Sequence, residues 1–161
     1  MSRRLSPQSS AMSGFTLVEL MVTLVVAAIL LMIAIPSYQT QIRESRRTEA
    51  KTAVLDLAGR EETLYSTQNL YSLTPSDVGY VGNNFPVQVG SNYYSVNVFV
   101  PNPNAVVTVP PTPSFLITAT PVGGTSQAQD APCQSFSVDQ LGNQTALDAG
   151  GAANNKTCWG T

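Results

Sequence analysis

Histidine is absent from this 161-residue chain, and cysteine occurs only twice. Without histidine, the sequence cannot build a Ser-His-Asp triad, a histidine-ligated metal site or a histidine proton shuttle. The two cysteines, Cys133 and Cys158, are 25 positions apart, which is too far for a compact Cys-x-x-Cys metal or redox motif. The sequence also lacks a nucleophile elbow and a phosphate-binding glycine loop, so we expect neither catalysis nor a cofactor.

Charged side chains are scarce as well, at 11% of the chain against roughly 25% in an ordinary soluble domain. Apolar residues make up 43%, which excludes disorder caused by high charge and low hydrophobicity. The length suits one ordinary domain with an appendage. Several aspartates stand singly in turn-like segments, and we interpret them as turn caps or solubilising groups; they are Asp77, Asp130, Asp139 and Asp148.

One long apolar run dominates the N-terminal part of the chain. Residues 15–35 contain a single charge, Glu19, and would extend about 32 Å as a helix at about 1.5 Å per residue. This length matches the roughly 30 Å hydrocarbon core of a bilayer. Three interpretations compete: a cleaved signal peptide, a simple signal anchor, and an apolar helix retained after loss of a short leader. Ile35 is followed by Pro36, a poor signal-peptidase site, which argues against the first interpretation.

The start of the apolar run favours the retained helix. The junction Gly14-Phe15-Thr16-Leu17-Val18-Glu19 resembles the prepilin signature of the type IV filament family, which includes type IV pilins and type II secretion pseudopilins. The resemblance implies a leader at residues 1–14, cleavage after Gly14 by a prepilin peptidase, and N-methylation of Phe15. It also implies that residues 15–35 stay in the mature protein as a transmembrane helix and later as filament core.

A carboxylate inside an apolar helix, such as that of Glu19, is expected to need a cationic partner. A carboxylate in a membrane helix costs on the order of 2.5–3.5 kcal/mol at the bilayer centre and less near the interface. Cleavage after Gly14 would give Phe15 a cationic amine four residues before Glu19. In a bundle of staggered helices, Glu19 of one subunit could neutralise the Phe15 amine of its neighbour, so that both charges are buried but paired. We therefore predict that Glu19 is a subunit–subunit assembly residue, which the resemblance also implies.

The cations around the apolar run do not agree with export of the part of the chain that follows it. Two precede it and four follow it, so the positive-inside rule would place the C-terminal part in the cytoplasm; they are Arg3, Arg4, Arg43, Arg46, Arg47 and Lys51. We give precedence to the prepilin-type junction and the expected disulfide, which require export. The part of the chain after the helix is then expected in the periplasm before assembly, anchored by one inner-membrane span. After assembly it is expected on a cell-surface pilus.

The helical pattern continues to about residue 67. Apolar residues between 50 and 65 recur at i, i+3, i+4 and i+7, which predicts an amphipathic helix. Arg43, Arg47 and Lys51 repeat at i, i+4 on the other side. We interpret this basic stripe as a solvated face, with contacts to neighbouring subunits or lipid headgroups as the alternative. Pro36 lacks a backbone donor and is predicted to kink the helix or loosen the preceding turn.

Residues 68–161 are expected to form a globular head. Loop-forming residues fill 69–92, and period-two alternation then predicts strands at 93–100, 115–120 and 135–138. Residues 144–147 could return as a fourth short strand. Three or four antiparallel strands packed on the helix make an α+β fold, in which a long N-terminal helix, membrane-spanning in its first half, covers a small sheet. A Pro-rich excursion at 101–113 is expected to be exposed.

Both ends of the chain carry the resemblance. If the head is exported, Cys133 and Cys158 should form a disulfide, with two buried free thiols as the alternative. The segment 133–142 and the closing Cys158-Trp159 resemble the C-terminal half of PilE-like minor pilins. The resemblance thus implies a type IV pilus subunit, most similar to minor pilins, that enters the filament or its initiation or tip complex and supports twitching motility, adhesion or DNA uptake.

The implied partners are other pilins, both major and minor, the prepilin peptidase, an inner-membrane assembly platform and, before assembly, membrane lipid. A major pilin, a type II secretion pseudopilin and a DNA-binding receptor pilin are the alternatives. The charges do not favour DNA as a partner, because binding to phosphates recruits several Lys or Arg residues. Without the leader, six basic residues stand against ten acidic ones, and only Lys156 lies outside the predicted helix.

Overall fold

The computed structural model describes residues 14–100 and 115–160, so most of the expected leader and the Pro-rich excursion lie outside the described residues. The chain divides into two units, Met1–Gln39 and Thr40–Thr161. Helix α1 spans Leu17–Gln68 and therefore belongs to the first unit at its start and to the second at its end. Its bounds lie within two residues of those predicted from the sequence.

Between residues 14 and 39, the part of the first unit that the structure describes, no apolar core covers α1. Every residue from 14 to 39 is exposed, although most of the side chains from Leu17 to Ile35 are large and apolar. The helix is long and apolar enough to cross a membrane. It continues through Pro36, and the kink predicted there stays a prediction.

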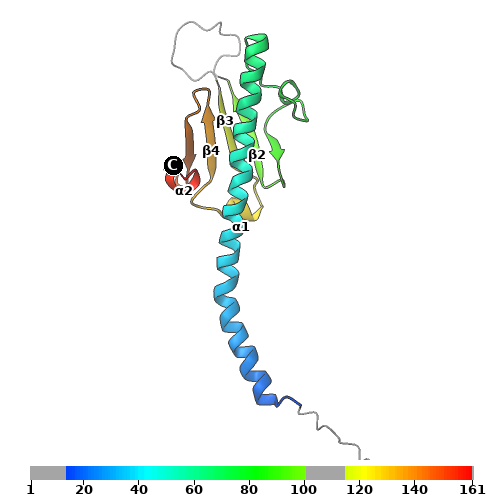
Figure 1. Cartoon of the computed structure of the whole chain (residues 1–161), viewed down its shortest axis with the longest axis vertical. Coiled ribbons are helices and arrows are strands. Elements are labelled where there is room, and N and C mark those ends of the chain that lie inside the picture. Colours follow the sequence, from blue (N-terminus) through cyan, green and yellow to red (C-terminus); the bar gives the residue numbers. More distant parts are fainter. Residues whose placement is uncertain (1–13, 101–114, 161) are drawn as a thin grey trace, which may run out of the picture. The chain divides into compact units, whose positions relative to one another are not determined.

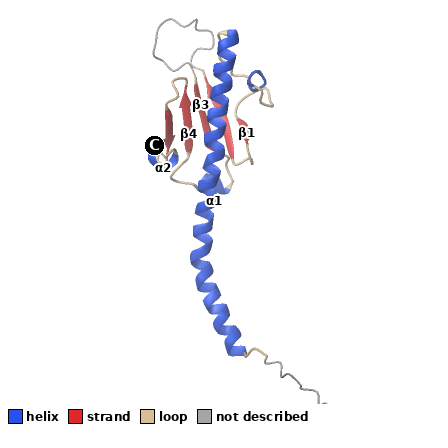
Figure 2. Ribbon diagram, in the orientation of Figure 1, coloured by secondary structure: helices blue, strands red, loops and turns tan. Residues whose placement is uncertain are grey.

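In the second unit, the remainder of α1 lies across one face of an antiparallel sheet (Figure 1). The sheet has five strands in the order β1-β2-β3-β4-β5, each hydrogen-bonded to its neighbour in sequence. The strands are β1 (Val87–Val89), β2 (Tyr94–Phe99), β3 (Leu116–Pro121), β4 (Ser135–Asp139) and β5 (Gln144–Leu147). Figure 2 shows β1 at one edge of the sheet. The α+β fold predicted from the sequence is confirmed.

The register explains why these segments form strands. In β2, Tyr94, Val96 and Val98 are buried, and Val96 lies opposite Ala119 while Val98 lies opposite Ile117. Side chains on a strand alternate between faces, so these residues share the inner face with those of β3 and β4. The predicted apolar stripe of α1 covers that face, and its fully buried members are Ala50, Val54 and Leu57. Each large apolar side chain buried there contributes about 1.5–3 kcal/mol.

The segment 69–92 contains more regular structure than the sequence indicated. A short 3₁₀ helix, η1, spans Pro75–Val78, and β1 pairs with β2 from Val87↔Val96 to Val89↔Tyr94. The assignment of this whole segment to loop was therefore wrong. Three residues between Pro86 and Gly90 are too few to show a period of two, and only the long-range pairing reveals the strand.

Candidate functional site

The predicted processing and assembly residues lie at the beginning of α1. Gly14 and Phe15 precede the helix, and Glu19 lies in its first turn. Thr16 Oγ1 accepts a hydrogen bond from the Glu19 N–H at 3.2 Å, which satisfies one of the free donors of the helix N-terminus. The Phe15 side chain is exposed. The carboxylate of Glu19 makes no ion pair with any residue in 14–100 or 115–160.

A buried ion pair joins α1 to the connection between β3 and β4. Arg47 Nε and Nη2 donate to the two carboxylate oxygens of Asp130 at 2.8 and 2.7 Å, a bidentate geometry. Gln127 Nε2 donates to the same carboxylate at 3.0 Å and to Tyr94 Oη at 2.8 Å. The hydrogen bond to Asp130 raises the pKa of Arg47 above its ordinary value, against the opposing effect of burial.

This ion pair corrects two interpretations made from the sequence. Arg47 is not part of a solvated stripe, and Asp130 is not a surface turn cap, because both side chains are buried. The two residues are 83 positions apart, and no local pattern in the sequence could reveal their contact. Asp139 and Asp148 do cap turns, since each accepts two backbone hydrogen bonds from the residues that follow it.

The other cations of this end of the head have neutral partners. Arg43 donates to Gln129 Oε1 at 2.9 Å, and Arg46 donates to Ser126 Oγ at 2.7 Å. The Arg46 guanidinium also lies 3.5 Å from the centroid of the Tyr93 ring. Neither arginine forms an ion pair within the described residues, so both can still attract an anion.

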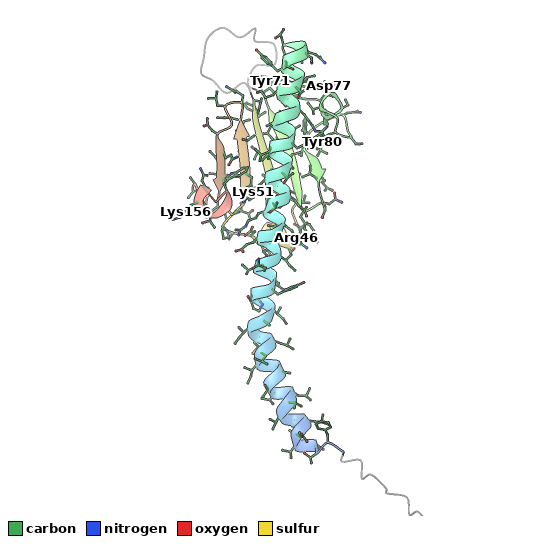
Figure 3. All side chains as sticks on the ribbon, in the orientation of Figure 1. Arg46, Lys51, Tyr71, Asp77, Tyr80 and Lys156 are labelled. Atoms are coloured by element: carbon green, nitrogen blue, oxygen red, sulfur yellow. A yellow bond between two sulfur atoms is a disulfide. The ribbon has the colours of Figure 1, made fainter. Side chains whose placement is uncertain are left out.

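Two lysines extend the positive charge, and a tryptophan ring lies close to one of them. The Lys51 ammonium lies 6.0 Å from the centroid of the Trp159 ring, and Lys156 is exposed on α2 (Asn155–Cys158). Burial lowers the pKa of Lys51, and repulsion from Arg47 adds to the shift. Figure 3 shows Arg46, Lys51 and Lys156 in the same half of the head. We call these four cations, together with the rings that Arg46 and Lys51 contact, the basic–aromatic surface; its members are Arg43, Arg46, Lys51, Tyr93, Lys156 and Trp159.

The C-terminal loop is fixed by a disulfide and by hydrogen bonds to the sheet. Cys133 and Cys158 are fully buried and bonded, as predicted. Asn155 Oδ1 accepts the N–H of Ala146 at 2.7 Å, and Trp159 Nε1 donates to a backbone carbonyl of β5 at 2.9 Å. Closure of a loop of this size stabilises the fold by roughly 3.5 kcal/mol on the chain-entropy account. Trp159 and the short helix α2, which carries Lys156, are thereby held against β5.

Among the residues that the structure describes, no three His, Cys, Asp or Glu side chains gather where they could hold a metal ion. The candidate sites described above are two surfaces. They comprise an exposed apolar helix with one acidic residue, and a disulfide-bounded head with a cationic, aromatic end. The described chain thus has an apolar N-terminal helix that continues into a small antiparallel α+β head.

Comparison with known families agrees with this architecture. The family model described as "Type IV minor pilin ComP, DNA uptake sequence receptor" matches residues 36–137, which is more than half of the chain. The model of the prokaryotic N-terminal methylation motif matches residues 9–35. The chain therefore belongs to the type IV pilin family, whose members are structural subunits that assemble with other pilins.

Individual relatives support the same family. The chain is 32% identical over 81 residues to the type IV major pilin protein PilA of Myxococcus xanthus (strain DK1622), which covers 48% of this chain and 37% of that protein. It is 38% identical over 72 residues to two fimbrial proteins of Pseudomonas aeruginosa, covering 44% of this chain and 47% of each. The chain thus matches less than half the length of these relatives.

Proposed function

We propose that this chain is a minor pilin of a type IV pilus. Residues 1–14 are a leader removed after Gly14 by a prepilin peptidase, and Phe15 becomes the methylated N-terminus. Residues 15–67 form the helix, whose part 15–35 anchors the chain in the inner membrane with the head, residues 68–161, in the periplasm. An assembly platform then transfers the subunit into the filament.

The observation that carries this proposal is the exposure of every residue from Phe15 to Ile35. Eighteen of these 21 residues are apolar. Without partners in the described chain, they need lipid or other helices around them. Glu19 adds a charge that a neighbouring subunit's Phe15 amine could neutralise. The match to a minor-pilin family model favours the minor over the major role.

Quantitative mass spectrometry of sheared surface filaments tests the minor role. We expect peptides of this chain in the filaments at far lower abundance than those of another pilin from the same cells. Deletion of the chain should then leave filaments that consist of that other pilin, or should reduce their number. If this chain is instead the most abundant filament protein, it is a major pilin and the proposed role is wrong.

A second function, contact with DNA during uptake, is favoured by the description of the family model and by the basic–aromatic surface. Its cations can attract phosphates, and its rings offer planes on which exposed bases can stack. The sequence argument against DNA considered the cations of α1 apart from the head. In the structure, Arg43, Arg46 and Lys51 belong to the same unit as Lys156.

Fluorescence anisotropy with labelled DNA and the full chain in detergent tests this contact. We expect a double variant, Lys51→Ala with Lys156→Ala, to bind DNA more weakly and to show a shallower salt dependence. The slope should fall by about 0.9 for each phosphate of duplex DNA that the variant no longer neutralises. Arg60→Ala is the matched control. Arg60 does not belong to this surface, and its Nε lies 2.8 Å from a carboxylate oxygen of Asp56. Equally weakened binding in the control variant, or unchanged binding in the double variant, would exclude the surface as the DNA site.

A further inference from the structure

Glu61 is a fully buried carboxylate on α1 that has no cationic partner among the described residues. Its Oε2 accepts a hydrogen bond from the backbone N–H of Ser72 at 3.0 Å. Its Oε1 is buried and has no hydrogen-bond partner in the described part of the chain. A neutral carboxylic acid tolerates such a position much better than a carboxylate, which needs several donors when water is excluded.

The segment that covers Glu61 follows directly after α1. Residues 69–80, which we call the 69–80 loop, include η1 and bury Ser72, Pro75 and Val78. The loop is held to α1 by few polar contacts, and the Glu61–Ser72 hydrogen bond is the buried one. The others are less buried: Tyr71 Oη donates to Glu62, Tyr80 Oη donates to Asp56, and Arg60 Nη1 donates to the Val78 carbonyl at 3.2 Å. The N–H of Asn69 also donates to the Tyr65 carbonyl at 2.8 Å.

The groups that face Glu61 from both elements are acidic or neutral. Glu62 lies beside it on α1, and Asp77 of η1 accepts a hydrogen bond from the Ser72 hydroxyl at 2.6 Å. The adjacent cation, Arg60, is engaged with Asp56 and with the carbonyl of Val78. Figure 3 shows Tyr71 and Asp77 at the end of the head where α1 stops, in the half away from Lys51.

These surroundings make the protonation of Glu61 sensitive to pH near neutrality. Burial raises the pKa of Glu61 to about 7, and the charges of Asp77 and Glu62 add to the rise, while the Ser72 hydrogen bond opposes it. Because the pKa in the docked state lies above the ordinary value of 4.5, docking is favoured by the proton. That contribution is complete below about pH 4.5 and is lost as the pH rises through about 7.

We propose that Glu61 is a proton-controlled latch for the 69–80 loop. With its proton, Glu61 stays buried beneath Ser72 and the loop remains docked on α1. When the proton passes to solvent, the carboxylate turns toward water, the Ser72 amide loses its acceptor and the loop loosens. The exposed side chains of Leu70, Leu73 and Val81, on the loop and next to it, are then presented differently to any neighbouring molecule. This device does not depend on the proposed pilus role.

Hydrogen exchange of the full chain in detergent micelles tests the latch. Exchange rates of peptides covering residues 70–78, corrected for the intrinsic effect of pH, are compared at pH 6 and pH 8. With a free pKa of 4.5 and a docked pKa of about 7, loop opening should increase about tenfold over this interval. In Glu61→Gln, a neutral side chain of the same shape, protection should not depend on pH. Glu44→Gln, at an exposed glutamate of α1 that does not contact the loop, is the matched control and should keep the wild-type pH dependence.

The latch is overturned if corrected protection in the wild type is the same at both pH values, or if Glu61→Gln keeps the full pH dependence. A second measurement covers the case in which Glu61→Gln does not fold. The ¹³C shift of the Glu61 carboxyl in the wild-type chain should titrate with a midpoint near 7, together with the Ser72 amide signal. A midpoint near the ordinary value of 4.5 would contradict the proposal.

Discussion

The two halves of α1 have the same secondary structure and opposite environments. From Leu17 to Gln39 the side chains are mainly apolar and all exposed, whereas from Thr40 to Gln68 an apolar stripe is buried against the sheet. The second half therefore finds its partner within the chain, and the first half needs one outside it. The comparison shows that one continuous helix can pack in two different environments. Burial depends on how apolar residues are distributed around the helix and not on helix propensity.

The largest effect is expected from removing the carboxylate of Glu19, the single charge between residues 15 and 35. Glu19→Ala should leave a folded, membrane-inserted protein that enters filaments about 100-fold less well or worse, because the Phe15 amine of a neighbour would be buried without a partner, at about 3–5 kcal/mol. Immunoblots of sheared filaments and of membranes measure this ratio. Glu44→Ala, which changes an exposed glutamate of the second half, is the control and should assemble normally. Normal incorporation of the Glu19 variant would refute its role in assembly.

The next effect concerns the buried ion pair of the second half. Asp130→Ala leaves the Arg47 guanidinium buried and unpaired, so the head should lose about 3–5 kcal/mol of unfolding free energy. Denaturant titration followed by the fluorescence of Trp159, the single tryptophan, measures this loss in the head. Asp56→Ala removes the exposed partner of Arg60 and should cost less than about 1 kcal/mol. Equal losses would mean that burial does not determine how much each ion pair contributes to the unfolding free energy.

A pair of identical substitutions separates the two halves directly. Leu57 is fully buried and Leu24 is 69% exposed. Leu57→Ala should lower the stability of the head by about 2–5 kcal/mol, because it removes buried apolar surface and leaves a cavity. Leu24→Ala should leave the same Trp159 transition unchanged. A comparable destabilisation of the head by both variants would show that the first half also packs within the chain.

The sequence predicted most of this fold because its signals are local. Period-two alternation located β2, β3 and β4, and helical spacing located the buried stripe that includes Val54 and Leu57. The apolar run and the junction at residues 14–19 required no tertiary information either. The disulfide followed from the number of cysteines and from the expected export.

The parts that the sequence did not reveal depend on pairing between distant residues. The strand β1 is recognisable only through β2, and Arg47 reads as a surface residue until Asp130 is placed beside it. Nothing in the sequence sets Glu61 apart from the other charges of α1, and its burial depends on how the 69–80 loop folds back over it. Charge alone indicates exposure, so buried charged groups are the residues that this kind of reasoning misses.

We expect the apolar half of α1 to stay in the mature protein and to pack with other subunits in a filament. Intact-mass and N-terminal peptide analysis of this chain from sheared filaments measures this. The expected chain begins at Phe15 with a methylated amine. A chain recovered with an N-terminus beyond Ile35, free in the medium, would contradict it.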